Sequence, residues 1–154
     1  MNFCFLIDWH SFRKSKRNTR RVVLIIKMAI HKILVVDDDP NILAAFQSFL
    51  EKEACEMIGV NQIVAVRKII QTGEIDLFIS DIRLGNTNSV RYLLEIKNQW
   101  PDLPLIVISG YPELISKEDL TKLKADYFFQ KPLELTRIRE AIRKLLRMNA
   151  VTNP

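Results

Sequence analysis

Residues 32–40 read KILVVDDDP, a short apolar run followed by three consecutive aspartates and a proline. The apolar part, residues 33–36, is rich in β-branched side chains and has no polar residue alternating with them, which is typical of a strand buried on both faces of a sheet. Asp39 followed by Pro40 is a helix start signal, with Asp39 as the N-cap. The stretch therefore predicts a buried strand that leads directly into a helix.

The rest of the chain repeats this pattern of short apolar runs and longer amphipathic segments. Strands are predicted at residues 33–36, 55–59, 76–80, 105–108 and 127–129. Helices are predicted at residues 40–53, 63–70 (closed by Gly73), 88–100, 112–124 and 133–148. Strict alternation of strands and helices indicates an α/β domain with a parallel sheet covered by helices on both faces.

Acidic side chains follow two of the predicted strands. Asp37 and Asp38 follow the first, and Asp81 follows the third. In an open parallel sheet, ligands bind beyond the carboxyl ends of the strands, so we expect these carboxylates to lie close together. Three such charges disfavour joint ionisation, and Mg²⁺, which takes carboxylate oxygens and keeps several waters, relieves the conflict. The acids therefore predict a magnesium site, with Asp39 reserved for helix capping.

Asp81 also has the surroundings of a phosphoryl acceptor. A carboxylate is a competent nucleophile toward phosphorus, and phosphoryl transfer needs mainly positioning and charge neutralisation. Ser109 follows the fourth predicted strand and Lys131 the fifth, which places a hydroxyl and an ammonium at the same edge. Each of these residues alone is as readily a turn serine or a surface lysine. Their coincidence at matching strand ends favours a functional site.

From residue 32 to about residue 146, the chain resembles the receiver domain of two-component response regulators. The motifs that carry the resemblance are residues 33–40, residues 76–84, Ser109-Gly110 and Lys131-Pro132. The resemblance implies a three-layer, doubly wound, five-stranded parallel sheet with the flavodoxin-like strand order 2-1-3-4-5. It also implies a stand-alone, chemotaxis-Y-like regulator, which catalyses only its own phosphorylation and the slow hydrolysis of the phosphorylated form.

The same resemblance implies a role for each site residue. Asp38 would be the direct ligand of Mg²⁺, with Mn²⁺ as the alternative cation, and Asp37 would act through water. Asp81 would take the phosphoryl group and also contact the metal, and the backbone carbonyl of Arg83 would be a further metal ligand.

The remaining implied roles concern the fourth and fifth strands. Ser109 and Lys131 would bind the phosphoryl oxygens, and Ser109 and Phe128 would form the conformational switch. The peptide bond between Lys131 and Pro132 would be cis. Plain core packing is the competing interpretation of Phe128.

The chain departs from the family pattern in the loop after Asp81. Residues 85–89 read GNTNS where the family usually has Pro-Gly-x-Asp-Gly, and Lys124 stands in place of a usual glycine. The loop thereby loses a rigid proline and a permissive glycine. Arg83 and Tyr111 flank the acceptor, and we hypothesise that Tyr111 shields the aspartyl phosphate from water.

Four rival functions are open. A haloacid-dehalogenase-type phosphatase needs an acid where Arg83 stands, and a flavodoxin-like electron carrier would not place three aspartates where it binds a phosphate. A nucleic-acid binder is suggested by the basic residues 13–21 and by the basic last helix. A phosphorylation-independent protein-interaction module with the receiver fold is the main alternative.

Charge and cysteine content indicate the organisation of the chain. Residues 1–30 carry seven Lys/Arg and one acid, whereas the remainder carries 16 basic and 17 acidic residues. We expect residues 1–30 to be a disordered basic extension, or to lie upstream of a true start at Met28. Residues 31–148 would form the domain and residues 149–154 a tail. Cys4 and Cys55 lack metal or redox spacing, which suits a cytoplasmic protein.

The predicted partners follow from the resemblance. They are a sensor histidine kinase or His-phosphotransfer protein and a downstream protein target, with a phosphorylation-dependent homodimer as a further readout. Neither direct nucleic-acid binding nor membrane insertion is expected.

Overall fold

The computed structural model describes residues 30–148, so the predicted extension at residues 1–30 falls outside it except for Ile30, and the tail at 149–154 is also outside. The strands are β1 (Lys32–Val36), β2 (Glu56–Val60), β3 (Leu77–Asp81), β4 (Arg83–Leu84), β5 (Thr87–Asn88), β6 (Leu105–Ser109) and β7 (Tyr127–Gln130). The α-helices are α2 (Pro40–Lys52), α3 (Val66–Ile70), α4 (Val90–Gln99), α5 (Lys117–Leu123) and α6 (Leu135–Leu145). Two short 3₁₀ helices, η2 (Ile63–Ala65) and η3 (Pro112–Leu114), precede α3 and α5.

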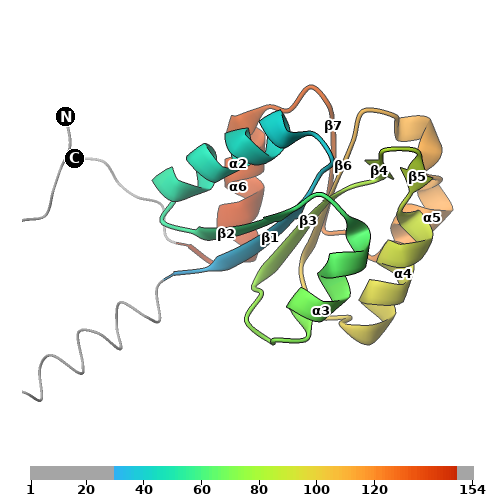
Figure 1. Cartoon of the computed structure of the whole chain (residues 1–154), viewed down its shortest axis with the longest axis horizontal. Coiled ribbons are helices and arrows are strands. Elements are labelled where there is room, and N and C mark those ends of the chain that lie inside the picture. The colour runs from blue at the N-terminus through green and yellow to red at the C-terminus, as the bar shows by residue number, and fades with distance from the viewer. Residues whose placement is uncertain (1–29, 149–154) are drawn as a thin grey trace, which may run out of the picture. The chain divides into compact units, whose positions relative to one another are not determined.

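Five strands form one parallel sheet in the order β2-β1-β3-β6-β7. Counted along the chain without the β4–β5 hairpin, this is the order 2-1-3-4-5, so the predicted fold class is confirmed. Figure 1 shows α2 and α6 on one face of the sheet and α3, α4 and α5 on the other.

Alternation along the strands divides the core between the two faces. In β1, Ile33 and Val35 pack with the side chains of α2 and α6, whereas Leu34 and Val36 pack with those of α3 and α4. All four are fully buried, as expected for parallel strands covered on both sides. The two cores therefore fix the register of β1, because a slip by one residue would exchange the faces.

An ion-pair cluster joins the end of α2 to α6. Glu53, only 8% exposed, accepts hydrogen bonds from Arg139 at 2.7 Å and from Arg143 at 3.0 Å. The buried carboxylate is thus paired on both oxygens, which offsets its desolvation. Two of the basic side chains of the last helix are accordingly used within the domain.

The predicted segment at residues 112–124 is not one helix. It consists of η3 and α5, separated at Ile115, whose side chain is buried. The Ser116 hydroxyl caps α5 by accepting a hydrogen bond from the Asp119 amide at 3.0 Å. A capping residue inside the apolar pattern therefore restarts the helix.

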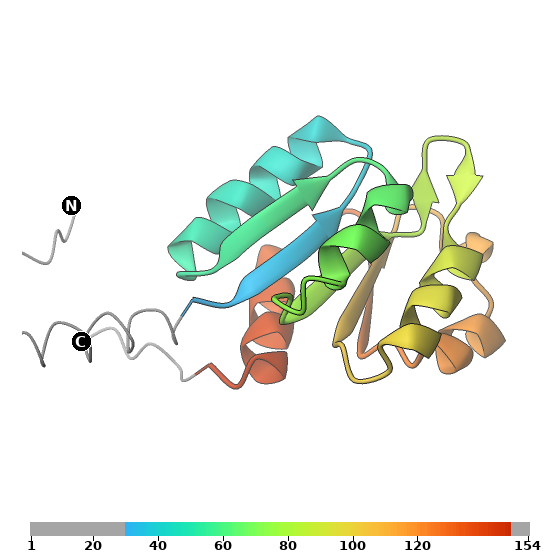
Figure 2. The ribbon, with the colours of Figure 1, turned by 60° about the horizontal axis from the view of Figure 1, so that its bottom comes forward.

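A second, two-stranded sheet occupies the loop that departs from the family pattern. Strands β4 and β5 pair antiparallel, with Arg83 opposite Asn88 and Leu84 opposite Thr87, so Gly85 and Asn86 form the turn. Gly85 has φ 59°, which suits glycine at the first central position of a hairpin turn. The hairpin projects beyond the sheet next to the start of α4 (Figure 2).

None of the helices formed by residues 30–148 has both the length and the apolarity that a bilayer span requires.

Candidate functional site

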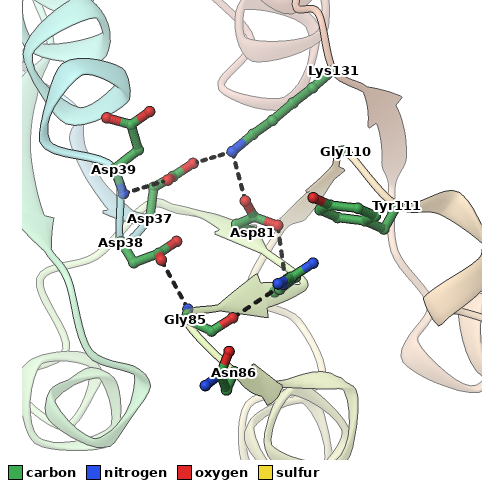
Figure 3. Close-up of a pocket in the computed structure, with 10 residues that line it drawn as sticks. Asp37, Asp38, Asp39, Asp81, Gly85, Asn86, Gly110, Tyr111 and Lys131 are labelled. Carbon is green, nitrogen blue, oxygen red and sulfur yellow. Dashed lines mark hydrogen bonds and ion pairs between the residues drawn. The ribbon is translucent and has the colours of Figure 1, made fainter.

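A pocket opens at the carboxyl ends of β1, β3 and β6, and Figure 3 shows the residues around it. Its lining combines four aspartates, the hairpin turn and the start of the loop after β6. The lining residues are Asp37, Asp38, Asp39, Asp81, Arg83, Gly85, Asn86, Gly110, Tyr111 and Lys131. The predicted convergence of strand-end side chains is thus confirmed for the acids and for Lys131.

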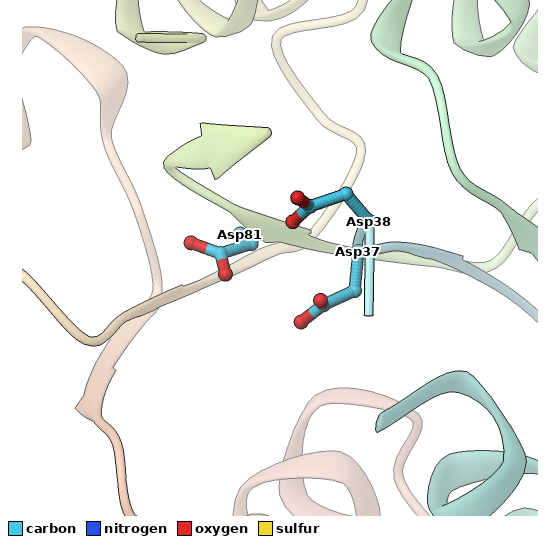
Figure 4. A group of neighbouring side chains, drawn as sticks. All are labelled: Asp37, Asp38 and Asp81. Carbon is cyan, nitrogen blue, oxygen red and sulfur yellow. The ribbon is translucent and has the colours of Figure 1, made fainter. Parts of the chain in front are cut away.

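The three predicted acids lie next to one another. Oxygen atoms of Asp37, Asp38 and Asp81 all lie within 4.8 Å of one another (Figure 4). Asp37 and Asp81 are buried, whereas Asp38 is exposed at the mouth of the pocket. The buried pair comes from adjacent strands β1 and β3, whose parallel pairing brings their carboxyl ends together.

Lys131 lies between the two buried acids. Its Nζ donates to Asp37 Oδ2 at 2.7 Å and to Asp81 Oδ2 at 2.6 Å. Burial raises the pKa of the Asp37 carboxyl above its ordinary value, although the hydrogen bond from Lys131 acts in the opposite direction. For Lys131, burial opposes the charge, but the bonds to Asp37 and Asp81 outweigh it and raise the pKa of the ammonium.

Backbone amides hold the other carboxylate oxygens. Asp37 Oδ1 accepts from the Asp39 amide at 2.9 Å, and Asp81 Oδ1 accepts from the Arg83 amide at 3.0 Å. Asp38 Oδ2 accepts from the Gly85 amide at 2.8 Å, which ties the hairpin turn to the acid cluster. A backbone amide therefore orients each of the three carboxylates, from a residue two positions later for Asp37 and Asp81 and from the hairpin turn for Asp38.

Asp39 behaves as predicted and caps α2. Its side chain accepts a hydrogen bond from the Asn41 amide at 2.8 Å, and Pro40 is the first helical residue. One aspartate of the triplet is thus accounted for by local structure, and Asp37 and Asp38 are left for the pocket.

The acid cluster fits a hard divalent cation. The three carboxylates carry three negative charges, and the ammonium of Lys131 offsets one of them, so two remain to be neutralised. The ligand atoms that the three acids offer are carboxylate oxygens, which Mg²⁺ prefers. Asp38 is the acid with no ammonium partner among the described residues. Asp37, Asp38 and Asp81 are the residues that could hold such an ion.

Ser109 and Phe128 do not contribute to the pocket lining in this structure. Ser109 is fully buried, and its hydroxyl oxygen accepts a hydrogen bond from the Tyr111 amide at 2.9 Å. Phe128 is partly buried and packs on the side of the sheet that α4 and α5 cover. The Lys131-Pro132 peptide bond is cis, as predicted.

The structure adds an aromatic–cation pair at the pocket. The Arg83 guanidinium lies over the Tyr111 ring, 4.5 Å from its centroid, and Arg83 Nε donates to the Gly85 carbonyl at 3.1 Å. Sequence reasoning placed both residues beside Asp81 but did not place them in contact. The Gly85-Asn86 pair, a hairpin-turn signal between two short runs, could have revealed the hairpin.

Comparisons with known proteins agree with this geometry. The family described as response regulator receiver domain matches residues 33–143. The chain is 26% identical over 121 residues to the response regulator protein PilR of Pseudomonas aeruginosa, covering 79% of this chain and 27% of that protein. It is also 26% identical over 114 residues to the heme response regulator HssR of Staphylococcus saprophyticus, covering 74% and 50%. The chain thus spans about a quarter to a half of the length of these curated relatives.

Two solved structures are similar over nearly their whole length. One is a CheY-like response regulator receiver domain protein from Methanospirillum hungatei, with a TM-score of 0.69 and 25% identity, covering 77% of this chain and 95% of that one. The other is the response regulator TrrA from Thermotoga maritima in complex with Mg²⁺ and BeF, with a TM-score of 0.67 and 28% identity, covering 75% and 99%. With the family match over residues 33–143, these likenesses show that the chain belongs to the response regulator receiver domain family.

Proposed function

We propose that this receiver domain is a stand-alone response regulator that accepts a phosphoryl group on Asp81. The observation that carries the proposal is the environment of that carboxylate, which is buried, bonded to Lys131 at 2.6 Å and grouped with Asp37 and Asp38. The donor would be a phosphohistidine of a sensor kinase or of a His-phosphotransfer protein. Transfer would form an oxygen–phosphorus bond at Asp81 and break the nitrogen–phosphorus bond of the donor imidazole.

A divalent cation, when bound, would neutralise phosphoryl oxygens during transfer. We assign Mg²⁺ to Asp37, Asp38, Asp81 and the Arg83 carbonyl, with Mn²⁺ as the alternative. The similar TrrA structure was solved with Mg²⁺ and BeF, which supports this assignment. Lys131 would keep its ammonium near the phosphoryl oxygens once the Asp81 carboxylate has become an acyl phosphate.

We further propose that the phosphoryl group displaces the Ser109 hydroxyl from its present partner, the Tyr111 amide. Ser109 would then donate to a phosphoryl oxygen, the loop after β6 would shift, and Phe128 would repack. The readout would be binding of a protein target, self-association or onward phosphotransfer, in the cytoplasm. A phosphorylation-independent interaction module is the alternative to this scheme.

Incubation with acetyl phosphate and Mg²⁺, followed by intact-mass measurement, tests the proposal. The wild-type chain should gain the mass of one phosphoryl group, and both Asp81→Asn and removal of the cation with EDTA should abolish the gain. Asp102→Asn is the matched control, because Asp102 is an exposed aspartate outside the pocket. A wild-type chain that gains no mass, or a gain that survives Asp81→Asn, rejects the proposal and favours the interaction module.

A further inference from the structure

Ser89 is a buried serine between the hairpin and α4 whose side chain has no assigned role. It is 1% exposed and occupies the N-cap position of α4. Its hydroxyl does not cap the helix; the Asn88 side chain accepts the hydrogen bond from the Val90 amide instead, at 3.0 Å. The ordinary reason for a serine at a helix start therefore does not apply here.

The Ser89 hydroxyl instead turns back toward the end of β3. Its Oγ lies 2.8 Å from the Ile82 carbonyl oxygen and 3.0 Å from the Asp81 carbonyl oxygen. The Ser89 amide also donates to the Ile82 carbonyl, at 2.8 Å. A hydroxyl has a single proton, so the two carbonyls share one donor.

The Ile82 carbonyl belongs to the peptide unit that also contains the Arg83 amide. Because a peptide unit is planar and rigid, fixing its carbonyl oxygen also fixes the direction of its N–H. That N–H donates to Asp81 Oδ1 at 3.0 Å. The terminal torsion of an aspartate has a broad energy minimum, so the direction of the Asp81 carboxylate is set by its two partners, the Arg83 amide on Oδ1 and Lys131 on Oδ2.

We propose that Ser89 is a positioning residue for Asp81, acting through the Ile82–Arg83 peptide unit. Ser89 holds the Ile82 carbonyl, the Arg83 amide then holds Asp81 Oδ1, and Asp81 Oδ2 is left facing Lys131. The catalytic consequence rests on the proposed function, whereas the orientation of Asp81 does not. Ser89 stands where the family pattern usually has glycine, so its hydroxyl is a departure from that pattern.

The competing explanation is that Ser89 only satisfies its own buried hydroxyl. Ser80 provides the matched control, because it is also fully buried and its Oγ donates to the Asp81 carbonyl at 2.9 Å. It makes no hydrogen bond to the Ile82 carbonyl. Ser89→Ala and Ser80→Ala therefore each remove one buried hydroxyl from the Asp81 carbonyl. Only Ser89→Ala also removes a hydrogen bond from the Ile82 carbonyl, which then keeps the bond from the backbone amide of residue 89 alone.

Hydrogen exchange of the Arg83 amide, followed by NMR on the metal-free full chain, tests the positioning role directly. Loss of about one hydrogen bond corresponds to about a tenfold change in protection. Ser89→Ala and Ser89→Gly should accelerate Arg83 exchange about tenfold, and Ser80→Ala should leave it unchanged. The Ile82 amide, which donates to Ile108, reports wider opening of the sheet in the same spectra. Unchanged Arg83 exchange in both Ser89 variants, or equal acceleration in Ser80→Ala, overturns the inference.

The rate of phosphorylation by acetyl phosphate at saturating Mg²⁺ tests the consequence. Misorientation of a reacting group slows the reaction without removing it, so Ser89→Ala should react about fivefold more slowly and still reach the full mass gain. Ser80→Ala should react at the wild-type rate. If the wild-type chain gains no phosphoryl group, the proposed function fails, yet the exchange result still decides the positioning role. If it does and Ser89→Ala reacts at the wild-type rate, the catalytic consequence is wrong.

Discussion

The two oxygens of Asp81 face different kinds of partner. Oδ2 meets the Lys131 ammonium at 2.6 Å, and Oδ1 meets the Arg83 amide at 3.0 Å. Tyr111 and the Arg83 guanidinium line the pocket beside the carboxylate. At the scale of residues, the questions are therefore how the acceptor is oriented and how water reaches it.

Tyr111 lines the pocket that contains Asp81, and we expect its ring to limit the access of water. Its side chain is 46% exposed, and the Arg83 guanidinium covers its ring. If the ring excludes water from the aspartyl phosphate, Tyr111→Ala should accelerate hydrolysis by about threefold to tenfold. The decay of the phosphorylated chain after removal of acetyl phosphate measures this rate.

Tyr111→Phe is the matched control, because it retains the ring and its contact with Arg83. Its decay rate should equal that of the wild type. A wild-type decay rate in Tyr111→Ala would end the shielding hypothesis.

Lys97 gives a pH dependence to folding. The buried ammonium donates to the Pro101 and Leu103 carbonyls at 2.8 and 2.7 Å, and burial lowers the pKa of the ammonium below its ordinary value of 10.5. Between the folded pKa and 10.5, the unfolded chain binds more protons than the folded chain, so stability rises with pH.

Comparison with Lys97→Met isolates this contribution. The free energy of unfolding of the wild type, relative to Lys97→Met, should increase in urea titrations as the pH rises from neutral toward 10.5. Lys68→Met, at an exposed position on α3, should show no such change relative to the wild type. Parallel curves for the wild type and Lys97→Met would contradict the prediction.

At the scale of elements, α5 ends in a strained residue. Lys124 follows the helix in the left-handed region, with φ 48° and ψ 41°, where the family usually has glycine. A non-glycine residue pays a steric cost in this region. Lys124→Gly should therefore raise the free energy of unfolding by about 0.5 to 1 kcal/mol, as measured by chemical denaturation.

The same substitution two residues earlier, inside the helix, has the opposite expected effect. Lys122 lies inside α5, where glycine costs about 1 kcal/mol. Lys122→Gly should thus destabilise the domain. If both glycine variants are destabilised equally, the steric cost assigned to Lys124 is wrong.

The elements that could be predicted were those with a sustained apolar period. Of the five strands of the main sheet, β1, β3 and β6 are almost wholly buried, and all five positions were predicted to within about two residues. The hairpin could not be found in this way, because β4 and β5 have two residues each and no period. The break at Ile115 was missed because the apolar Ile115 and the capping residue Ser116 are as compatible with one continuous helix as with two short ones.

The candidate site could likewise be predicted only in part. Topology alone brings Asp37, Asp81 and Lys131 to one edge, so strand order was enough to predict their proximity. The direction of a hydroxyl depends on rotamers that tertiary contacts select. The inward-facing side chains of Ser89 and Ser109 were therefore beyond the reach of sequence patterns.

At the scale of the whole molecule, the receiver fold places its chemistry at one end of the sheet. Membership of the family makes the chain a component of two-component signalling and not a conventional enzyme. Both helical layers pack on the strands whose ends carry the acids, α2 and α6 on one face and α3, α4 and α5 on the other.

Charge is the remaining property of the whole chain that bears on its partners. Residues 28–154 carry 16 basic and 17 acidic side chains, whereas the seven other basic residues lie before Met28. Two of the four basic residues of α6, Arg139 and Arg143, are paired with Glu53 at 2.7 and 2.8 Å, which reduces the positive charge that this helix offers to a partner. A protein that binds nucleic acid through phosphate contacts needs unpaired cations and shows steep salt dependence.

We therefore expect residues 28–154 to bind duplex DNA negligibly and with little dependence on salt. Fluorescence anisotropy with a labelled duplex, between about 50 and about 200 mM salt, measures this. The full chain is the comparison, because any attraction that it shows at low salt should come from its first 27 residues and weaken steeply as salt rises. Equal phosphorylation rates of the two chains would show that the shortened one is folded. Tight, salt-sensitive binding by residues 28–154 would instead place a nucleic-acid surface on the domain itself, against the pairing of Glu53 with α6.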